Sequence, residues 1–258
     1  MTAVTTTQGE VVARARGMRD LVRAEAAESE RQRTMSAPIV EEMWASGLMS
    51  AFNPVVAGGA EPSFAEMIET WIEMAWQDGS FGWTGIANLP SSFAAATYLP
   101  EQGFAEVFAA NDNHVTMGGQ FAPNGQGVVT DGGYRLTGAW SFGSGTGHSQ
   151  YVAAGFIPMD DGEMRWISEG IPELLVALLP RAEVNFTDGW NVQGLKGTGS
   201  YDYNLADVFV PEYRTFRLFT TCPLRGTSPA GRMGMMPVTA AGHAGWALGV
   251  AKSMLDDV

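Results

Sequence analysis

The chain has 258 residues, 45% of them hydrophobic, so it is long enough for one large globular domain or two modest ones. Acidic residues outnumber basic ones by 28 to 15, and the formal net charge of -13 argues against nucleic acid or an anionic membrane surface as a partner. The single cysteine, Cys222, excludes an internal disulfide framework and a multi-cysteine metal site. Without a signal-like start or a membrane-length apolar run, the sequence predicts a cytoplasmic protein.

Residues 1–112 are predicted to form an N-terminal, all-helical domain. Apolar residues recur at spacings of three and four over residues 9–34, as an amphipathic helix requires. Ser36 and Pro38 are placed to cap and begin a second helix, which Gly47 ends.

A third helix follows in the same domain. Ser63 and Glu66 have the spacing of a capping box, and a broad apolar stripe continues from them to the stop signal Asp78-Gly79. The segments after Pro90 and Pro100 predict two shorter helices.

Residues 113–222 are predicted to form a central antiparallel β domain that is barrel-like. Two strand candidates, 128–130 and 134–136, flank the turn sequence 131–133, which is the signal of a β-hairpin. Further apolar runs bounded by turn residues predict strands at Tyr151–Ile157, Leu174–Leu179 and Val208–Val210.

Residues 223–258 are predicted to begin a C-terminal helical bundle. The sequence there is rich in Ala, Gly and Met, and Gly242, Gly245 and Gly249 permit close helix packing. Helices, then strands, then helices again are the order of an α+β fold with segregated layers.

Two segments, 137–145 and 194–200, combine aromatic residues with glycines and small hydroxyl residues. Each lies where a strand-like run ends and backbone amides become available to a ligand, an arrangement that suits a flat heteroaromatic cofactor. In this order and spacing they resemble the acyl-CoA dehydrogenase superfamily. The Gly-x-Trp-x-Phe-x-Ser-Gly form is most similar to its flavin-dependent, two-component (group D) monooxygenase branch.

The resemblance implies roles for the first segment. Phe142 is expected to pack against the flavin ring, and Ser144 to act beside flavin N5 as a binding and catalytic group. Trp140 and Gly145 are expected to complete this part of the flavin site. From the residues alone, the pattern favours core positions for the aromatics and a turn hydroxyl for Ser144.

Five further positions are implied to bind the cofactor. Gln120, Phe121 and Ala122 occupy the place where dehydrogenase members carry a Thr-Glu-Pro-Gly-type turn, and this departure argues against a standard acyl-CoA dehydrogenase. In the second segment, Lys196 and Thr198 are expected near the flavin. Lys196 can instead be a solvated loop residue.

Trp83 and Asn88 lie in a glycine-broken helical stretch whose counterpart in the superfamily lines the substrate side of the flavin. Trp83 can alternatively be a core anchor. His148, four residues after Ser144, is a candidate acid or base, or else a capping or surface residue. The three histidines are too scattered in the sequence for a recognisable metal site.

The resemblance implies the oxygenase of a two-component monooxygenase, which uses reduced FAD or FMN and O2 to hydroxylate a small substrate that can be aromatic. No nicotinamide-binding motif is present, so a separate flavin reductase is expected to supply the reduced flavin. A homo-oligomer, such as the superfamily's tetramer, is also implied. Two alternatives stay open: an acyl-CoA dehydrogenase-like FAD enzyme that oxidises an acyl thioester, and an incomplete, non-catalytic fragment or partner subunit.

Overall fold

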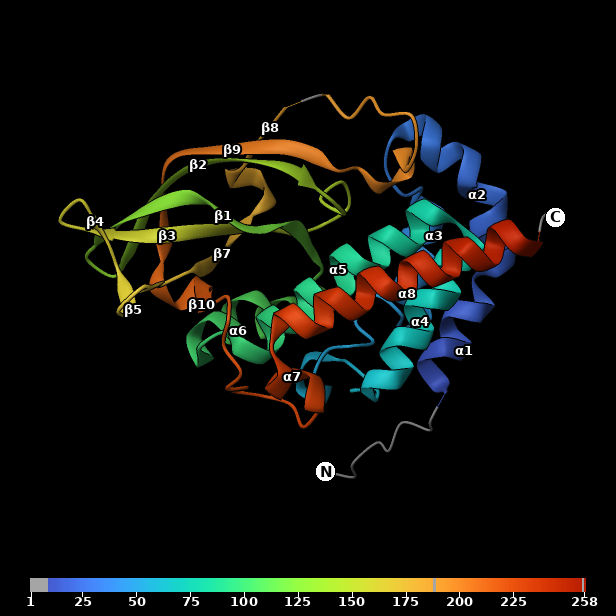
Figure 1. The fold of residues 1–258 in the computed structure, drawn as a ribbon, viewed down its shortest axis with the longest axis horizontal. Helices are drawn as coiled ribbons and strands as arrows, with labels where there is room; N and C mark the ends of the chain where they lie inside the picture. The colour runs from blue at the N-terminus through green and yellow to red at the C-terminus, as the bar shows by residue number, and fades with distance from the viewer. Residues whose placement is uncertain (1–8, 188, 257) are drawn as a thin grey trace.

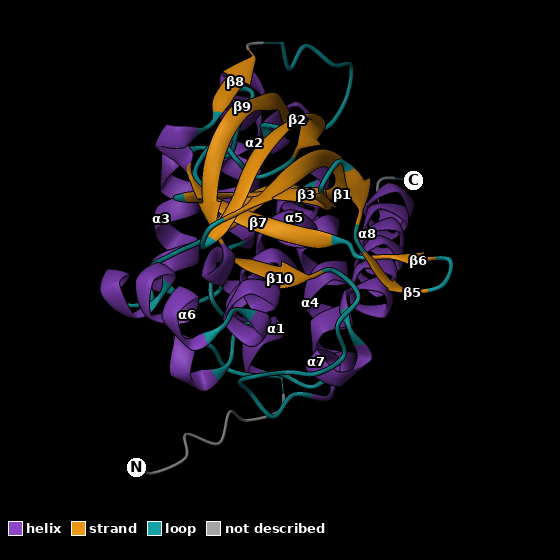
Figure 2. Cartoon of the chain, turned by 90° about the vertical axis from the view of Figure 1, so that its left-hand side faces the viewer, coloured by secondary structure: helices purple, strands orange, loops and turns teal. Residues whose placement is uncertain are grey.

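A computed structural model describes residues 9–187, 189–256 and 258. Figures 1 and 2 show the strands gathered on one side of the molecule and most of the helices on the other. The helices α4, α5 and α8 lie next to one another and meet the strand layer along α5.

The predicted helix over 9–34 is wrong in one respect, because the structure has two helices there, α1 (Glu10–Gly17) and α2 (Arg19–Gln32). The break falls at Met18, directly after Gly17, and glycine is among the residues least favourable to a helix interior. The second predicted helix is confirmed as α3 (Ala37–Ala45), with Pro38 in its first turn, but Ser36 at its N-terminus makes no side-chain capping hydrogen bond.

The third predicted helix is α4 (Phe64–Gln77), and its cap is confirmed: Ser63 Oγ accepts the backbone N–H of Glu66 at 3.2 Å. The Glu66 carboxylate does not complete a capping box in the usual way. It accepts the backbone N–H of Val11 at 2.8 Å instead and so ties α4 to α1.

The next helix, α5 (Gly79–Tyr98), runs without interruption through Pro90. The prediction of a separate helix after Pro90 is therefore wrong. Because α5 is buried along most of its length, tertiary packing outweighs the proline's unfavourable helix propensity. Helix α6 (Glu101–Val107) follows Pro100 as predicted.

The strands form one large sheet in the order β10-β7-β3-β1-β2-β9-β8, with β4 paired to β3, and β5 pairs with β6 apart from it. The predicted hairpin is confirmed, since Val129 pairs with Tyr134 and Thr130 with Gly133. The strands are β1 (Met117–Thr130), β2 (Gly133–Gly143), β3 (Tyr151–Asp160), β4 (Glu163–Met164), β5 (Trp166–Ser168), β6 (Ile171–Pro172), β7 (Leu175–Pro180), β8 (Asn185–Thr187), β9 (Tyr201–Pro211) and β10 (Thr215–Arg217).

The sheet is mixed rather than purely antiparallel, because β1 and β3 pair in parallel, Met117 opposite Tyr151. The chain leaves β2 at the end where β1 begins, and the short connection 144–150 crosses the start of β1 into β3. A Cβ atom at Gly118 would lie 2.4 Å from the Ser144 carbonyl oxygen, so the crossing requires glycine there.

Short 3₁₀ helices connect the main elements: η1 (Val55–Ala57), η2 (Ala109–Asn111), η3 (Arg181–Glu183), η4 (Lys196–Thr198) and η5 (Glu212–Arg214). After the sheet come α7 (Pro229–Met233) and α8 (Met235–Asp256), and α8 packs along α4. In the described part of the chain, no helix has both the length and the apolarity that a membrane crossing needs.

The main hydrophobic core includes residues from the N-terminal helices, from the sheet and from α7 and α8, and a second core lies within the sheet. The main core contains residues from all three predicted domains, 1–112, 113–222 and 223–258, so the three do not have separate cores. Those domain boundaries stay predictions.

Candidate active site

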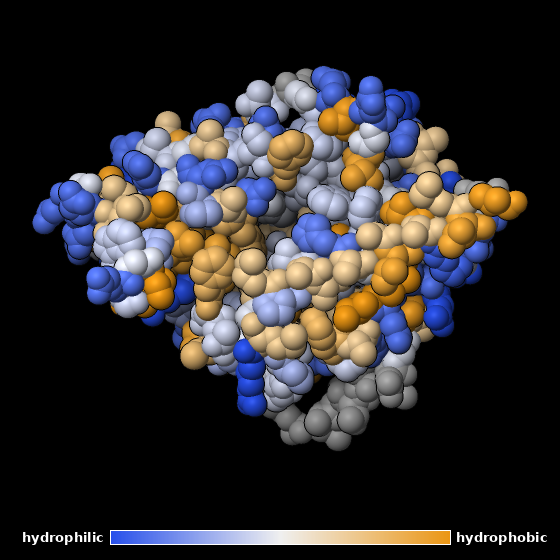
Figure 3. Space-filling view, in the orientation of Figure 1, coloured by the Kyte–Doolittle hydropathy of each residue, from blue (hydrophilic) through white to orange (hydrophobic). Residues whose placement is uncertain are grey.

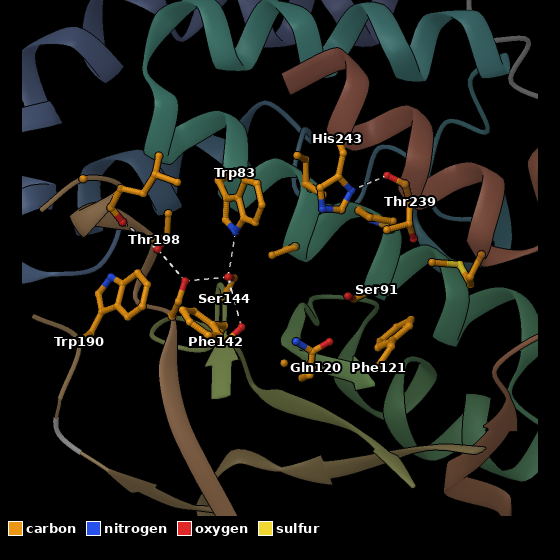
Figure 4. Close-up of a pocket in the computed structure, with 18 residues that line it drawn as sticks. Trp83, Ser91, Gln120, Phe121, Phe142, Ser144, Trp190, Thr198, Thr239 and His243 are labelled. Atoms are coloured by element: carbon orange, nitrogen blue, oxygen red, sulfur yellow. Dashed lines mark hydrogen bonds between the residues drawn. The ribbon is translucent and has the colours of Figure 1, made fainter. Parts of the chain in front are cut away.

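A cavity of about 410 Å³ lies where the sheet meets α5 and α8 (Figure 4). Its size is in the range of small-molecule sites. Four aromatic side chains line it from distant parts of the chain: Trp83, Phe121, Phe142 and Trp190. The polar lining residues are Ser91, Gln120, Ser144, Thr198, Ser200, Thr239 and His243.

Ser144 enters the cavity wall through the connection that crosses β1. Phe142 has a positive φ of 62°, and the Ser144 backbone N–H donates to the Phe142 carbonyl at 2.7 Å, which makes a tight turn at the end of β2. The Ser144 carbonyl accepts the Gly119 N–H at 3.2 Å. The turn is therefore fixed to β1, and the Ser144 side chain is 7% exposed.

A chain of hydrogen bonds runs through the Ser144 hydroxyl. Trp83 Nε1–H donates to Ser144 Oγ at 3.0 Å, and Ser144 Oγ lies 2.7 Å from Ser200 Oγ. Ser200 Oγ lies 2.7 Å from Thr198 Oγ1, which donates to the Leu195 carbonyl at 2.9 Å. Figure 4 shows this chain along one wall of the cavity. Helix α5 and the two segments singled out in the sequence thus meet at one hydroxyl.

Phe142 and Trp190 form an aromatic corner beside that hydroxyl. Their rings meet edge to face with centroids 6.0 Å apart, and Phe142 is 63% exposed. The Trp190 indole N–H donates to the Lys196 carbonyl at 3.1 Å, which fixes the Trp190 ring over η4. An exposed large aromatic ring next to a polar hydroxyl is a surface that a flat ligand can cover.

The segment after Gly119 bulges out of β1. Its pairing with β3 is interrupted between Gln120 and Gly125, and a Cβ atom at Gly155 would lie 2.1 Å from the Phe121 carbonyl oxygen. Gln120 and Phe121 line the cavity, whereas Ala122 is not among the lining residues.

Three other predicted cofactor residues lie outside the cavity lining. Trp140 is 1% exposed in the core of the sheet, where its ring stacks on Tyr203 at 5.3 Å and its indole N–H donates to the Gly155 carbonyl. Gly145 is covered by Asn88. A Cβ atom at residue 145 would lie 2.5 Å from Asn88 Oδ1. Lys196 contributes its carbonyl to Trp190, as described above.

The predicted substrate residue Asn88 and the predicted acid or base His148 hydrogen-bond to each other behind the cavity wall. The Asn88 side chain is fully buried and donates to the Met117 carbonyl at 2.9 Å. Its Oδ1 lies 3.0 Å from His148 Nε2, and an amide oxygen only accepts, so Nε2 carries the hydrogen. Burial, with a smaller effect from the nearby Arg181 charge, lowers the pKa of His148 to about 4. The neutral imidazole therefore fixes the β2–β3 connection on α5.

On α8, two polar cavity residues, Thr239 and His243, were not among the site residues predicted from the sequence. His243 Nδ1 lies 2.7 Å from the Thr239 carbonyl oxygen, so Nδ1 carries the hydrogen in the neutral ring, and the ring meets Trp83 edge to face at 5.4 Å. The two residues are four apart in a helix and therefore share a face, and this spacing is the sequence signal that could have identified them as a pair. Ser200, also missed, lies in a segment that the sequence had already singled out.

No family model matches the chain. A pigment production hydroxylase from Rhodococcus erythropolis is 34% identical over 209 residues, which are 80% of this chain and 51% of that protein. The oxygenase component of an FADH2-dependent resorcinol hydroxylase from Rhizobium sp. (strain MTP-10005) is 33% identical over 226 residues, 86% of this chain and 52% of that protein.

The structure of 3-HSA hydroxylase from Rhodococcus sp. RHA1 superimposes with a TM-score of 0.86 at 26% identity, covering 96% of this chain and 63% of that one. XiaF from Streptomyces sp., in complex with FADH2 and glycerol, gives a TM-score of 0.82 at 27% identity over 95% of this chain and 61% of that one. The chain's homologues are thus oxygenase components of flavin-dependent two-component monooxygenases, and its structural neighbours have the acyl-CoA dehydrogenase fold. The resemblance drawn from residues 137–145 and 194–200 is thereby confirmed. The chain spans about half the length of the curated flavin monooxygenases it matches.

Proposed function

We propose that this chain binds reduced FAD or FMN in the cavity and forms the flavin and substrate site of an oxygenase that hydroxylates a small aromatic compound with O2. The observation that carries the proposal is the meeting of Ser144 with the exposed Phe142 ring and the half-buried Trp190 ring in one cavity wall. This is the combination that an isoalloxazine needs, since the ring has a large apolar area and a few polar edge atoms.

The residues present fit a flavin. Phe142 and Trp190 offer apolar surface for the ring, and the Ser144 hydroxyl offers a polar partner for N5. Thr198 and Ser200 lie beside it and add hydroxyls to the same wall. Bound flavin supplies the oxygen-activating chemistry, and the protein supplies position and exclusion of water.

The protein's own residues have distinct tasks in this proposal. Ser144 orients the flavin edge, because its oxygen is fixed by Trp83 on one side and by Ser200 on the other. Trp83 and Phe121 exclude water from the space between flavin and substrate, and a dry site protects reactive intermediates from solvent.

The substrate class is proposed from the end of the cavity beneath α8. Phe121 and Met235 give it apolar surface, and Ser91, Thr239 and His243 give it a few polar groups. A flat aromatic compound with one or two polar substituents matches this lining. The resorcinol hydroxylase is a relative whose name includes such a compound.

The proposed partners follow from the same relative, which is an oxygenase component. We expect a separate flavin reductase to supply the reduced flavin, and we expect the chain to form a homo-oligomer. The cytoplasmic location inferred from the sequence stays a prediction.

The proposal is tested by anaerobic titration with reduced FAD and reduced FMN, followed by addition of O2 and a panel of phenols and indoles, with products identified by mass spectrometry. We expect saturable binding of reduced flavin and a product heavier by one oxygen atom. Ser144→Ala is expected to weaken flavin binding by about tenfold, because it removes one hydrogen-bonding group. The matched control is Ser168→Ala, in the exposed strand β5.

The two alternative readings predict other outcomes. Anaerobic bleaching of bound oxidised FAD by acyl-CoA thioesters indicates a dehydrogenase. Among the described residues that line the cavity there is no aspartate or glutamate, whereas such a dehydrogenase needs a carboxylate base. Failure to bind either flavin in either redox state contradicts the proposal and favours a non-catalytic fragment or partner subunit.

A further inference from the structure

The hydrogen-bond chain through Ser144 has a definite direction. It consists of four short contacts: Trp83 to Ser144, Ser144 to Ser200, Ser200 to Thr198, and Thr198 to the Leu195 carbonyl. The indole N–H and the three hydroxyls provide one hydrogen for each contact. The indole only donates and the carbonyl only accepts, so every contact holds a hydrogen in a single arrangement, in which each group donates to the next one toward Leu195.

Any other arrangement leaves two oxygen atoms in close contact without a hydrogen between them. If the Ser144 hydrogen pointed into the cavity, two hydroxyl hydrogens would remain for the three contacts from Ser144 to Leu195. Two of these oxygen–oxygen distances are 2.7 Å, which is the usual length of a hydroxyl hydrogen bond. The Phe142 carbonyl, 3.4 Å from Ser144 Oγ, is an alternative acceptor, but it also keeps the hydrogen within the protein.

Ser144 therefore faces the cavity as a hydrogen-bond acceptor. Its hydroxyl has two lone pairs, one of which receives the Trp83 indole N–H, so one lone pair is left for a ligand. The Ser144 backbone N–H cannot serve as a donor instead, because it is already bound to the Phe142 carbonyl at 2.7 Å.

We propose that this directed chain makes the site selective for the redox state of the flavin. The inference rests on the proposed function. Reduced flavin carries a hydrogen on N5, which Ser144 Oγ accepts, whereas oxidised flavin presents a lone pair at N5. An oxidised flavin in the same position either places two acceptors against each other or breaks a contact in the chain. Thr198 and Ser200 are thus positioning residues that act through Ser144.

The test is the ratio of the dissociation constants of oxidised and reduced flavin, measured anaerobically. Thr198→Val keeps the shape of the side chain but removes the acceptor for the Ser200 hydrogen. Ser200 then donates to Ser144, and the Ser144 hydrogen is free to point at the flavin. We expect the preference for reduced flavin to fall about tenfold, which equals about 30 mV lower midpoint potential of the bound two-electron couple.

A substitution at the other end of the chain has the opposite expected result. Trp83→Phe removes the indole donor, but the three hydroxyl hydrogens still fill the three remaining contacts, so Ser144 stays an acceptor and the preference persists. Ser200→Ala is a second way to free the Ser144 hydrogen and is expected to shift the ratio as Thr198→Val does. The matched control is Thr146→Val, whose buried hydroxyl donates to the Gly143 carbonyl outside this chain.

The outcomes separate this inference from the proposed function. An unchanged ratio in Thr198→Val and Ser200→Ala, with both flavin forms still bound, overturns the inference and leaves the proposed function standing. A loss of the preference in Trp83→Phe equal to that in Thr198→Val also overturns it. No binding of either form to the unsubstituted chain instead overturns the proposed function. Circular dichroism and the midpoint of thermal unfolding confirm that each variant is folded.

Discussion

His148 illustrates how burial sets the protonation state, and so the structural role, of a titratable side chain. Its Nε2 is bound to Asn88, and its Nδ1 is buried without a hydrogen-bond partner among the described residues, so an added proton on Nδ1 has no acceptor there. Burial and the nearby Arg181 charge lower the pKa of His148 to about 4. The folded protein therefore keeps this ring neutral at pH values where an unfolded chain protonates it.

This difference predicts a pH dependence of stability. Because the folded pKa lies below the unfolded value of 6.5, the unfolded state binds a proton that the folded state does not, and stability is lost as the pH falls from 6.5 toward 4. We expect His148 to lower the free energy of unfolding by on the order of 2 kcal/mol between pH 7 and pH 5. Urea unfolding at both pH values measures it.

The control for this prediction is His148→Gln, which keeps a hydrogen-bonding side chain but does not titrate. The variant is expected to show a smaller drop in stability between pH 7 and pH 5 than the unsubstituted chain. An equal drop in both proteins contradicts the assignment to His148.

Among individual residues, the sequence predicted that Ser144, Phe142 and Trp83 lie at the cavity, but it misplaced Trp140. In a regular strand, residues 140 and 142 would point to the same face. The positive φ of Phe142 and the break in pairing between Trp140 and Gly143 end that alternation, so one ring enters the core and the other the cavity. Such a local irregularity is not visible in the spacing of residue types. His243 was missed because it comes from a helix distant in sequence.

At the scale of elements, the contact of α8 with α4 depends on glycines to different degrees. A Cβ at Gly249 would lie 2.3 Å from the Ile72 carbonyl oxygen, whereas a Cβ at Gly242 would lie 3.5 Å from its nearest neighbours, in Ile86 and Trp71. The first position brings α8 against the α4 backbone, and the second leaves room for a methyl group.

This contrast predicts opposite effects of one methyl group in one helix. Gly249→Ala is expected to lower the free energy of unfolding by about 2 kcal/mol, because the two helices must separate. Gly242→Ala is expected to be neutral or to stabilise the protein by up to about 1 kcal/mol, because alanine favours the helix. Urea unfolding of both variants at pH 7.5 measures the difference. Equal stabilities would show that α8 does not pack in this way.

The element boundaries show what the sequence can and cannot predict. Periodicity and caps located α3, α4 and α6, and the turn sequence located the hairpin of β1 and β2. Local signals failed for α5, where packing overrides Pro90. Local signals also failed to predict the parallel pairing of β1 with β3. This pairing arises because the connection 144–150 crosses the start of β1 and places β3 on the side of β1 opposite β2.

At the scale of the whole molecule, α8 presents apolar side chains to solvent on the faces away from α4, and Figure 3 shows them on one surface. Met236, Leu248, Met254 and Leu255 are 63%, 58%, 66% and 75% exposed. Exposed apolar side chains of this kind are typical of protein interfaces.

We therefore expect the chain to self-associate. Light scattering after size-exclusion chromatography is expected to give a mass above that of one chain. The double variant Leu248→Lys, Leu255→Lys is expected to have a mass closer to that of a single chain, because the lysines place charge in the interface. Val128→Lys, at a strand residue that is 55% exposed, is the matched control. A single-chain mass for the unsubstituted protein at all concentrations contradicts the expectation.

The crossing of β1 by the connection 144–150 also makes the cavity wall depend on the completed fold. The position of Ser144 depends on the pairing of β1 with β2 and β3, and its partner Ser200 directly precedes β9, more than fifty residues later in the chain. A partly folded chain lacks the cavity in which we propose that the flavin ring binds. A ligand that binds only the finished topology shifts the equilibrium toward it by mass action. Titration with flavin would then count the correctly folded molecules in a preparation.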